Sequence, residues 1–454
     1  MSDVADGTAP AEAIQVSPAV LTICRALAEA GHEAWAVGGA IRDALLGRPI
    51  GDWDVATSAH PDEVAALFPH TVPTGVEHGT VTVVVGRGKG HEAIEVTTFR
   101  GEGAYSDARR PDEVRFGVPL DEDLARRDFT INAIAFDPLA KVIRDPFGGR
   151  RDLGRRLVRA VGDPEERFRE DGLRVMRAVR FVAQLDCAVD PATEDAIPRA
   201  LDSLAKVARE RVRVELFRLL VGCAAPRALD LSRRCGVIDV AAPEVAARYP
   251  ASEPHTWRAA LTRLSHAPAD APLRLVTLLA HAAPALPAEW ETLAPSRRIA
   301  ALEDRDAVRD TEALLRGLRA SNTDRKRACQ LVGLAAAPRA ADLEAPLLRR
   351  LAGRIGRDRA ADLAALWRAD HLASGDEKLA PAAERLEGIL TRKEPVCARD
   401  LAVSGGELMR ALGLSPGPQV GELVDDLVEE VCDDPSRNER DALLARARAR
   451  LESG

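Results

Sequence analysis

A short segment, residues 37–54, constrains the fold and chemistry of this chain more than any other. Gly38 and Gly39 follow an apolar stretch, and glycine lets backbone amides approach an anionic group closely. Asp52 and Asp54 come soon afterwards, and at this spacing on an extended strand both carboxylates lie on the same face. Like charges held this close repel each other unless a cation lies between them. The segment therefore predicts a divalent-cation site beside a phosphate-binding turn, which is typical of phosphoryl or nucleotidyl transfer.

Each half of this segment also has a purely structural interpretation. A lone Gly-Gly pair is usually a turn, and a lone Asp-x-Asp is usually a solvated loop or a helix cap. Their combination within one short segment, with Arg42 between them, favours the functional interpretation. Because only oxygen ligands are expected, next to a phosphate-sized hollow, the predicted cation is Mg²⁺.

Length and composition limit the remaining choices. At 454 residues the chain is too long for one core, and about three or four domains are expected. No apolar run approaches the length of a membrane span, so no membrane partner is expected. The seven scattered cysteines argue against zinc and disulfides and for a reducing, cytoplasmic location. A net charge of -8 gives no global attraction to nucleic acid, so any RNA contact must use a local basic patch, such as the arginines between residues 144 and 180.

Hydrophobic periodicity predicts a mixed head. The expected helices are 19–31, 41–46 and 61–68, and the expected strands are 34–37, 52–56, 80–85, 92–99 and 141–144. Residues 100–119 have little apolar content and predict a mobile loop.

Beyond Pro164 the pattern is helical to the end of the chain, with no convincing strand. Breaks between helices are expected near residues 226, 243–254, 284–295 and 380–395. The predicted fold class is therefore α+β, with a small mixed head followed by a long all-helical part.

Five motifs carry a family resemblance. In chain order they are Gly38-Gly39 with Arg42, Asp43, Asp52 and Asp54; residues 126–133; residues 145–149 with Asp152 and Leu153; Glu170-Asp171 with Arg174, Arg177, Ala178, Arg180 and Phe181; and Glu210-Arg211 with Glu215-Leu216. With these motifs the chain resembles the class II tRNA nucleotidyltransferases, which are the bacterial CCA-adding enzymes and their poly(A) polymerase relatives. The match covers residues 35 to about 240 closely and residues 395–454 more loosely.

The resemblance implies a polymerase-β-like nucleotidyltransferase head, with a mixed sheet and helices, followed by all-helical neck, body and tail domains. The expected parts are a disordered lead-in (1–18), the catalytic head (19–160), a neck with a nucleobase-selecting helix (161–225), a body (226–390) and an RNA-binding tail (391–454).

The implied function is template-independent addition of CCA to the tRNA 3′ end from CTP and ATP, with release of pyrophosphate by a two-metal mechanism. The segment 100–119 resembles the flexible loop that CCA-adding members use between adding C and adding A. A poly(A) polymerase or CC-adding enzyme of the same family stays open as an alternative. A non-catalytic helical RNA-binding protein is the alternative from another class. The sequence predicts no oligomeric state.

The resemblance also assigns roles to residues of the head. Asp52 and Asp54 are the expected catalytic pair and the Mg²⁺ ligands. Glu95, on an apolar strand, is a candidate third carboxylate, and an exposed strand glutamate is the equally weighted alternative. Nucleotide contacts are expected from Gly38, Gly39, Arg42, Arg127 and Asp128, with Asn132 as a further candidate at the ribose. For Arg42 the alternative is an ion pair with Asp43 on a helix surface, and for Arg127 and Asp128 it is a buried structural pair.

The last predicted constellation is Asp171, Arg174, Arg177 and Arg180, spaced three residues apart. On a helix this is a slowly drifting stripe, for which a solvated, salt-bridged face is the ordinary interpretation. Asp171 accepts and Arg174 donates, which matches the exocyclic amine and ring acceptor of cytosine or adenine. Uracil and guanine would place a carbonyl oxygen against the carboxylate. The pair is therefore expected to select C and A, while Arg177 and Arg180 anchor the triphosphate or the helix itself.

Overall fold

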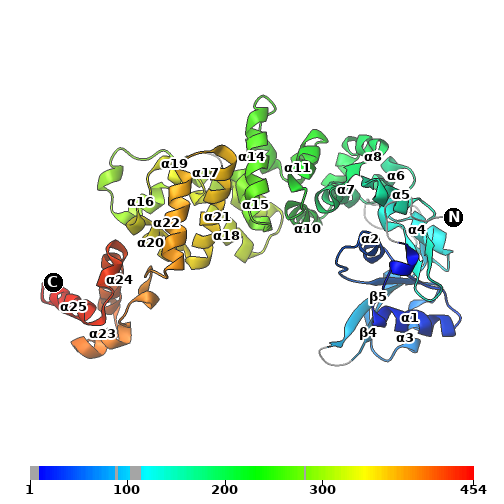
Figure 1. Ribbon diagram of the computed structural model, residues 1–454, viewed down its shortest axis with the longest axis horizontal. Coiled ribbons are helices and arrows are strands. Elements are labelled where there is room, and N and C mark those ends of the chain that lie inside the picture. The colour runs from blue at the N-terminus through cyan, green and yellow to red at the C-terminus, as the bar shows by residue number, and fades with distance from the viewer. Residues whose placement is uncertain (1–9, 87–89, 103–113, 281–282, 454) are drawn as a thin grey trace. The chain divides into compact units, whose positions relative to one another are not determined.

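The computed structural model describes residues 10–86, 90–102, 114–280 and 283–453 (Figure 1). It divides the chain into two compact units, Met1–Ala241 and Ala242–Gly454. The predicted division into head, neck, body and tail is finer than this and stays a prediction. Of the predicted lead-in, residues 1–9 lie outside the described residues. From residue 10 onward the chain is ordered earlier than predicted, because Ala11–Ala13 form a 3₁₀ turn and the apolar Ile14 is buried.

A mixed sheet of seven strands frames the first unit, in the order β3-β4-β5-β2-β1-β8-β9. Its strands are β1 (Ala34–Val37), β2 (Asp54–Thr57), β3 (Thr71–Gly75), β4 (Thr80–Val85), β5 (Glu92–Thr98), β8 (Ala135–Asp137) and β9 (Val142–Arg144). The pair β2–β5 is parallel and the other pairs are antiparallel. In the register of β1 with β2, Val37 lies opposite Asp54. The sheet therefore places the start of the Gly-Gly turn beside one of the predicted catalytic carboxylates.

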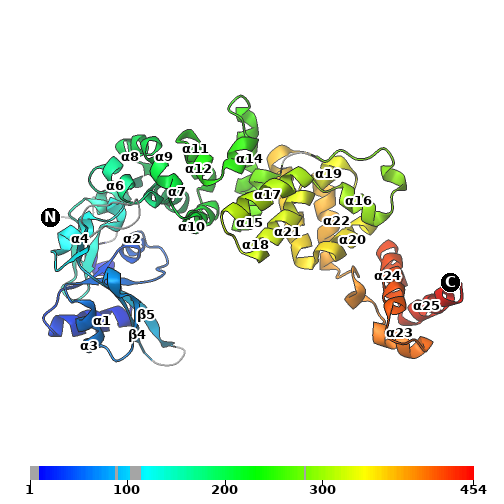
Figure 2. The ribbon, with the colours of Figure 1, turned by 180° about the vertical axis from the view of Figure 1, so that it is seen from behind.

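Two amphipathic helices cover this sheet. Helix α1 (Pro18–Glu29) begins after Ser17, whose side chain accepts a hydrogen bond from the Val20 amide, and α3 (Pro61–Leu67) packs beside it. Both helices contact strands of the sheet, and Figure 2 shows them lying together along it. The predicted helices and strands of this region are present, with boundaries shifted by one or two residues, as frayed helix ends allow. Strand β3 was not predicted, because its side chains are largely exposed and leave no apolar pattern.

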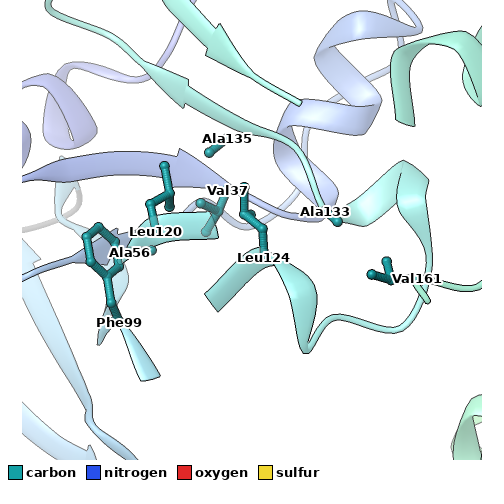
Figure 3. Close-up of a cluster of buried hydrophobic side chains, with 8 residues drawn as sticks. All are labelled: Val37, Ala56, Phe99, Leu120, Leu124, Ala133, Ala135 and Val161. Carbon is teal, nitrogen blue, oxygen red and sulfur yellow. The ribbon is translucent and has the colours of Figure 1, made fainter. Parts of the chain in front are cut away.

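An apolar cluster packs the central strands against helix α4 (Leu120–Ala125) and the segments that follow it. Its buried members, drawn in Figure 3, are Val37, Ala56, Phe99, Leu120, Leu124, Ala133, Ala135 and Val161. Burial of its larger side chains, the valines, leucines and phenylalanine, stabilises the fold by about 1.5–3 kcal/mol each. The cluster thereby holds the Arg126-Arg127 segment, which directly follows α4, against the end of β1.

The predicted mobile loop 100–119 is only partly correct. Strands β6 (Arg100–Glu102) and β7 (Val114–Phe116) pair antiparallel at its two ends, and residues 103–113 lie outside the described residues. The pairing was not predicted because it depends on a distant contact, in which the Phe116 ring packs edge-on against His60 at 5.9 Å.

Short helices complete the first unit. They are α2 (Gly39–Leu45), α5 (Gly149–Gly154), α6 (Pro164–Glu170), α7 (Leu173–Leu185), α8 (Pro191–Ala196), α9 (Leu201–Ala205), α10 (Arg209–Leu220), α11 (Ala225–Arg234) and α12 (Val237–Ala241). Helix α7 contacts both α10 and α11. The prediction of no strand beyond Pro164 is wrong at one place, because β11 (Ala188–Val189) pairs with β10 (Leu157–Val158), a contact too short to leave a periodic signal.

The second unit is helical, with no strand among its described residues. The α-helices are α13 (Pro243–Arg248), α14 (Pro254–His266), α15 (Ala271–Leu279), α16 (Pro295–Ala301), α17 (Arg305–Gly317), α18 (Asn322–Leu334), α19 (Ala337–Ala340), α20 (Ala345–Ile355), α21 (Arg357–Ser374), α22 (Leu379–Thr391), α23 (Gly405–Leu412), α24 (Pro418–Asp433) and α25 (Arg440–Ser453). The predicted break at 380–395 is wrong over most of its length, because Pro381 lies in the first turn of α22, where a missing amide is tolerated. No helix in the described ranges is long and apolar enough to cross a membrane.

Gly149 offers a test of how tightly the first unit is packed. A β-carbon there would lie 2.1 Å from the Thr130 carbonyl oxygen, so Gly149→Ala must push α5 away from the adjoining turn. We expect the variant to lose about 2 kcal/mol or more of unfolding free energy, measured by urea unfolding followed by circular dichroism. Gly421→Ala is the control, because a β-carbon in that part of α24 meets open space. Equal stability of both variants would contradict the close packing.

Candidate active site

A cavity of about 610 Å³ in the first unit gathers the predicted site residues. Every predicted residue except Glu95 lines it: Gly38, Gly39, Arg42, Asp52, Asp54, Arg127, Asp128, Asp171, Arg174, Arg177 and Arg180. These residues come from the turn into α2 and α2 itself, the segment that leads into β2, the segment after α4, the α6–α7 junction and α7. Segments more than a hundred residues apart therefore share one hollow.

The Gly-Gly turn leads from β1 into α2. Gly38 has φ = 74°, a conformation that favours glycine, and a β-carbon there would lie 3.2 Å from Nη1 of Arg127 and 3.8 Å from Oδ2 of Asp54. The turn therefore lies directly between a guanidinium group and a carboxylate. Any larger residue would intrude between these two charged groups.

The two aspartates do not share a strand as predicted. Asp54 is the first residue of β2 and is half-buried, whereas Asp52 precedes the strand and is exposed. The Gly51-Asp52 segment does not pair with a neighbouring strand, which is why the strand begins two residues later than expected. Both aspartates still line the cavity.

Glu95 lies next to Asp54 in the parallel register of β2 with β5, but it is exposed and does not line the cavity. Burial raises the pKa of Asp54 to about 6, and the charges of Glu95 and Asp52 add to this effect against the opposing charge of Arg127. In the described part of the chain, no group of three or more His, Cys, Asp or Glu side chains is arranged to hold a metal ion. A metal site here would rest on Asp52 and Asp54, and Glu95 stays a prediction as a third ligand.

A chain of hydrogen bonds crosses the floor of the cavity. Nη1 of Arg42 donates to Oδ1 of Asn132 at 2.8 Å, and Nδ2 of Asn132 donates to Oδ1 of Asp128 at 3.0 Å. Nε of Arg177 donates to Oδ2 of Asp128 at 2.6 Å. The ion pair of Arg42 with Asp43, named above as the structural alternative, is also present at 2.8 Å. Helix α2 and helix α7 are thus joined through Asn132 and Asp128.

The environment of Asp128 keeps its carboxylate charged. Burial alone would raise its pKa, but the Arg177 guanidinium and the Asn132 amide outweigh burial and lower the pKa to about 2. The sequence offered a buried pair of Arg127 with Asp128 as the structural interpretation. The structure instead pairs Asp128 with Arg177 and Arg127 with Asp123, because the packing of the segment after α4 against α7 decides which charges meet. The same residue lines the cavity, so a contact with a ligand stays a prediction.

The predicted base-selecting pair lies at the junction of α6 and α7. Asp171 stands two residues before the first residue of α7, not on the helix, and its carboxylate accepts from the Leu173 amide at 3.0 Å and from Nη2 of Arg211 at 2.7 Å. Arg174 is paired with Glu170 and donates through Nη2 to the Arg126 carbonyl at 3.1 Å. Both groups are therefore held by neighbours from other helices.

The contacts of Arg180 anchor helix α7. Its guanidinium lies 2.5 Å from the Glu215 carboxylate of α10 and 4.0 Å from the centre of the Phe181 ring. Burial lowers the pKa of Arg180 to about 10, with Glu215 acting against this and Arg177 adding to it. These contacts hold α7 against α10.

Sequence reasoning missed Asp123. This buried carboxylate accepts from Nη2 of Arg126 at 2.8 Å, from Nη2 of Arg127 at 3.3 Å and from the Arg100 amide at 3.3 Å. It fixes the Arg127 guanidinium near Gly38. The signal was an acidic residue three and four positions before two arginines, a spacing that places them on one side of a helix.

Comparison with known proteins places the chain in a family. Family models match residues 34–159 (Poly A polymerase head domain), 187–248 (Probable RNA and SrmB-binding site of polymerase A) and 302–447 (tRNA nucleotidyltransferase domain 2, putative). The CCA-adding enzyme of Geobacillus stearothermophilus is 54% identical over 217 residues, and that of Ligilactobacillus salivarius is 54% identical over 202 residues. These alignments cover 48% and 44% of this chain, and they span only about half of each relative, 52% and 49%.

Solved structures extend the likeness along the chain. The Bacillus stearothermophilus CCA-adding enzyme in complex with CTP has a TM-score of 0.67 and 33% identity, covering 96% of this chain and 99% of that one. The Thermotoga maritima CCA-adding enzyme complexed with tRNA has a TM-score of 0.60 at 20% identity, covering 96% of each chain, and shows the fold alone. The fold is that of a nucleotidyltransferase. The chain belongs to the family of the bacterial CCA-adding enzymes, a nucleotidyltransferase family that generally uses divalent metals.

The buried Asp128–Arg177 pair predicts a pH-dependent stability. Because the folded-state pKa of about 2 lies below the ordinary value near 4, the contribution is fully present above pH 4 and is lost as the pH falls toward 2. Two units of pKa correspond to about 2–3 kcal/mol. We expect urea unfolding between pH 3 and pH 6 to show a steeper acid loss for the wild-type protein than for Asp128→Asn. Parallel curves for the two proteins would contradict this assignment.

Proposed function

We propose that this protein adds CCA to the 3′ end of tRNA from CTP and ATP, without a nucleic-acid template and with release of pyrophosphate. One observation carries the proposal: paired carboxylates, a Gly-Gly turn and an Asp/Arg pair suited to C and A line the same 610 Å³ cavity. The likeness to a CCA-adding enzyme crystallised with CTP supports it. The proposed setting is the bacterial cytoplasm, and the proposed RNA-binding parts include the tail, residues 391–454.

The nucleotide would lie with its triphosphate toward Gly38, Gly39 and Arg127. A guanidinium group offers planar, charge-assisted hydrogen bonds to phosphate oxygens. Asp123 holds Arg127 in place before any ligand arrives, so little ordering is required on binding. Arg42 already donates to Asp43 and Asn132, so its proposed phosphate contact requires at least one of these bonds to be shared or exchanged.

The base would meet Asp171 and Arg174. The Asp171 carboxylate accepts the exocyclic amine of cytosine or adenine, and Arg174 donates to the ring nitrogen beside it. A carboxylate has about four acceptor positions, so the bonds from Arg211 and Leu173 leave capacity for a base. Because neighbours hold both groups, the edge that reads the base is formed by protein alone.

Asp52 and Asp54 would hold Mg²⁺. Their oxygens are the ligands this ion prefers. Burial is the main cause of the raised pKa of Asp54, and the charges of Glu95 and Asp52 add to it, so a cation bound there would stabilise the charged carboxylate. Divalent ions bound there supply activation of the RNA 3′-hydroxyl and neutralisation of the pyrophosphate leaving group. The chain's own contribution is to hold the two carboxylates beside the phosphate-binding turn.

Nucleotide incorporation tests the function directly. The protein is incubated with tRNA lacking its 3′ CCA and with each labelled nucleotide singly and together. We expect C, C and A to be added in order and addition then to stop. Long A tails would indicate a poly(A) polymerase, addition of C alone a CC-adding enzyme, and no incorporation a non-catalytic RNA-binding protein.

The carboxylate pair is tested in the same assay. We expect Asp52→Asn/Asp54→Asn to lower the rate by roughly a thousandfold or more, because both groups that hold the ions lose their charge. Asp62→Asn, an exposed residue of α3, is the matched control and should keep the wild-type rate. Wild-type activity of the double variant would exclude the proposed mechanism.

Base selection is tested by competition between CTP and UTP. We expect Asp171→Ala and Arg174→Ala to reduce the preference for C over U by roughly 10- to 100-fold, the range of one lost bidentate contact to a base. Glu166→Ala removes an exposed carboxylate from α6 and should leave the preference unchanged. Full selectivity in both site variants would show that other residues choose the base.

A further inference from the structure

A second hollow adjoins the active-site cavity within the first unit. It has a volume of about 640 Å³ and shares Arg42, Asp43, Gly51, Arg180 and Arg218 with that cavity. From there it extends along Arg48 and along the C-terminal ends of α7 and α10. Asp54, the Gly-Gly turn and the base-selecting pair do not line it. We call this hollow the arginine groove.

The arginine groove has an excess of positive charge. Four arginines line it, at positions 42, 48, 180 and 218, and Asp43 is the acidic residue in its wall. Arg42 is paired with Asp43, and Arg180 is paired with Glu215. Arg48 and Arg218 have no carboxylate partner in the described part of the chain, although the chain as a whole carries a net charge of -8.

The exposed Arg218 adds to this excess of positive charge. Its charge acts on neighbouring Arg180 and disfavours the protonated form of that residue, so the two guanidinium groups repel each other. An arrangement of like charges in a concave surface costs stability unless an anion neutralises it. The groove is therefore suited to a polyanion.

The walls of the groove are held in place. Nη1 of Arg48 donates to the Gln184 carbonyl at 2.8 Å, which joins the loop after α2 to the end of α7. A β-carbon on Gly222 would lie 2.5 Å from the Ala183 carbonyl oxygen, so the chain leaving α10 packs directly on α7. The groove is thus formed by the fold before a ligand binds.

We propose that the arginine groove binds the phosphodiester backbone of the RNA substrate next to its 3′ end, with Arg48 and Arg218 as phosphate contacts. This inference rests on the proposed function. The groove begins at Gly51, beside Asp52, where the 3′-hydroxyl must arrive for transfer, while Gly38, Gly39 and Arg127 line only the active-site cavity. Two polyanions, the nucleotide and the RNA, then approach the carboxylates from separate sides. Contacts to phosphates read no sequence, which suits a substrate class with many different members.

RNA affinity separates this proposal from a role in nucleotide binding. Binding of tRNA lacking CCA is measured by fluorescence anisotropy at several salt concentrations for Arg48→Ala, Arg218→Ala and Arg218→Glu. We expect affinity losses of roughly 3- to 10-fold for the alanine variants and a larger loss for Arg218→Glu, with a salt dependence shallower by about one counterion for each arginine. The KM for CTP should change far less than the affinity for RNA. Arg25→Ala and Arg25→Glu, at an exposed position on α1, are charge-matched controls.

Other outcomes would overturn the proposal. RNA affinity and salt dependence equal to those of the Arg25 variants would exclude an RNA role for the groove. A raised KM for CTP, or weaker inhibition by pyrophosphate, with unchanged RNA affinity would assign the groove to free or nucleotide phosphates instead. If the wild-type protein incorporates no nucleotide, the proposed function fails, whereas the anisotropy comparison still decides whether the groove binds RNA.

Discussion

The active site depends on a buried chain of hydrogen bonds from Arg42 through Asn132 and Asp128 to Arg177. This hydrogen-bond chain joins α2, which begins in the Gly-Gly turn, to α7, which carries Arg174 of the base-selecting pair. Each member satisfies another, so loss of one leaves a polar or charged group buried without its partner, and this costs more than a single bond contributes. The two halves of the cavity are therefore held in one arrangement by the protein itself.

Around this chain of hydrogen bonds, the arginines serve different purposes according to their partners. Arg180 pairs with Glu215, contacts the Phe181 ring and stabilises helix packing. Arg127 is held by Asp123 at the edge of the phosphate-binding turn. Arg48 and Arg218 lack carboxylate partners among the described residues and give the adjoining groove its charge. A protein with a net negative charge thus presents a local positive field where polyanions are expected.

Much of the fold could be predicted because its signals are local. The strands 34–37 and 80–85 were predicted at the bounds observed, since short apolar and β-branched runs end at turn residues. The β6–β7 and β10–β11 ladders were missed because each has only two or three residues per strand and depends on pairing with a distant segment. Asp52 was placed on the strand because alternation alone does not show where pairing with β1 and β5 begins.

The sequence by itself determined which residue types stand at which spacing, and with them the motifs, the α+β class and the family. Only the tertiary structure decided which charges meet. Arg177 pairs with Asp128, which is 49 residues away in the sequence, and Arg211 pairs with Asp171, which is 40 residues away. Such pairs are set by strand register and by the packing of α7 against α10, which arise from the whole core and not from any one segment. That is why the pairing of Arg211 with Asp171 and the arginine groove emerged only from the folded chain.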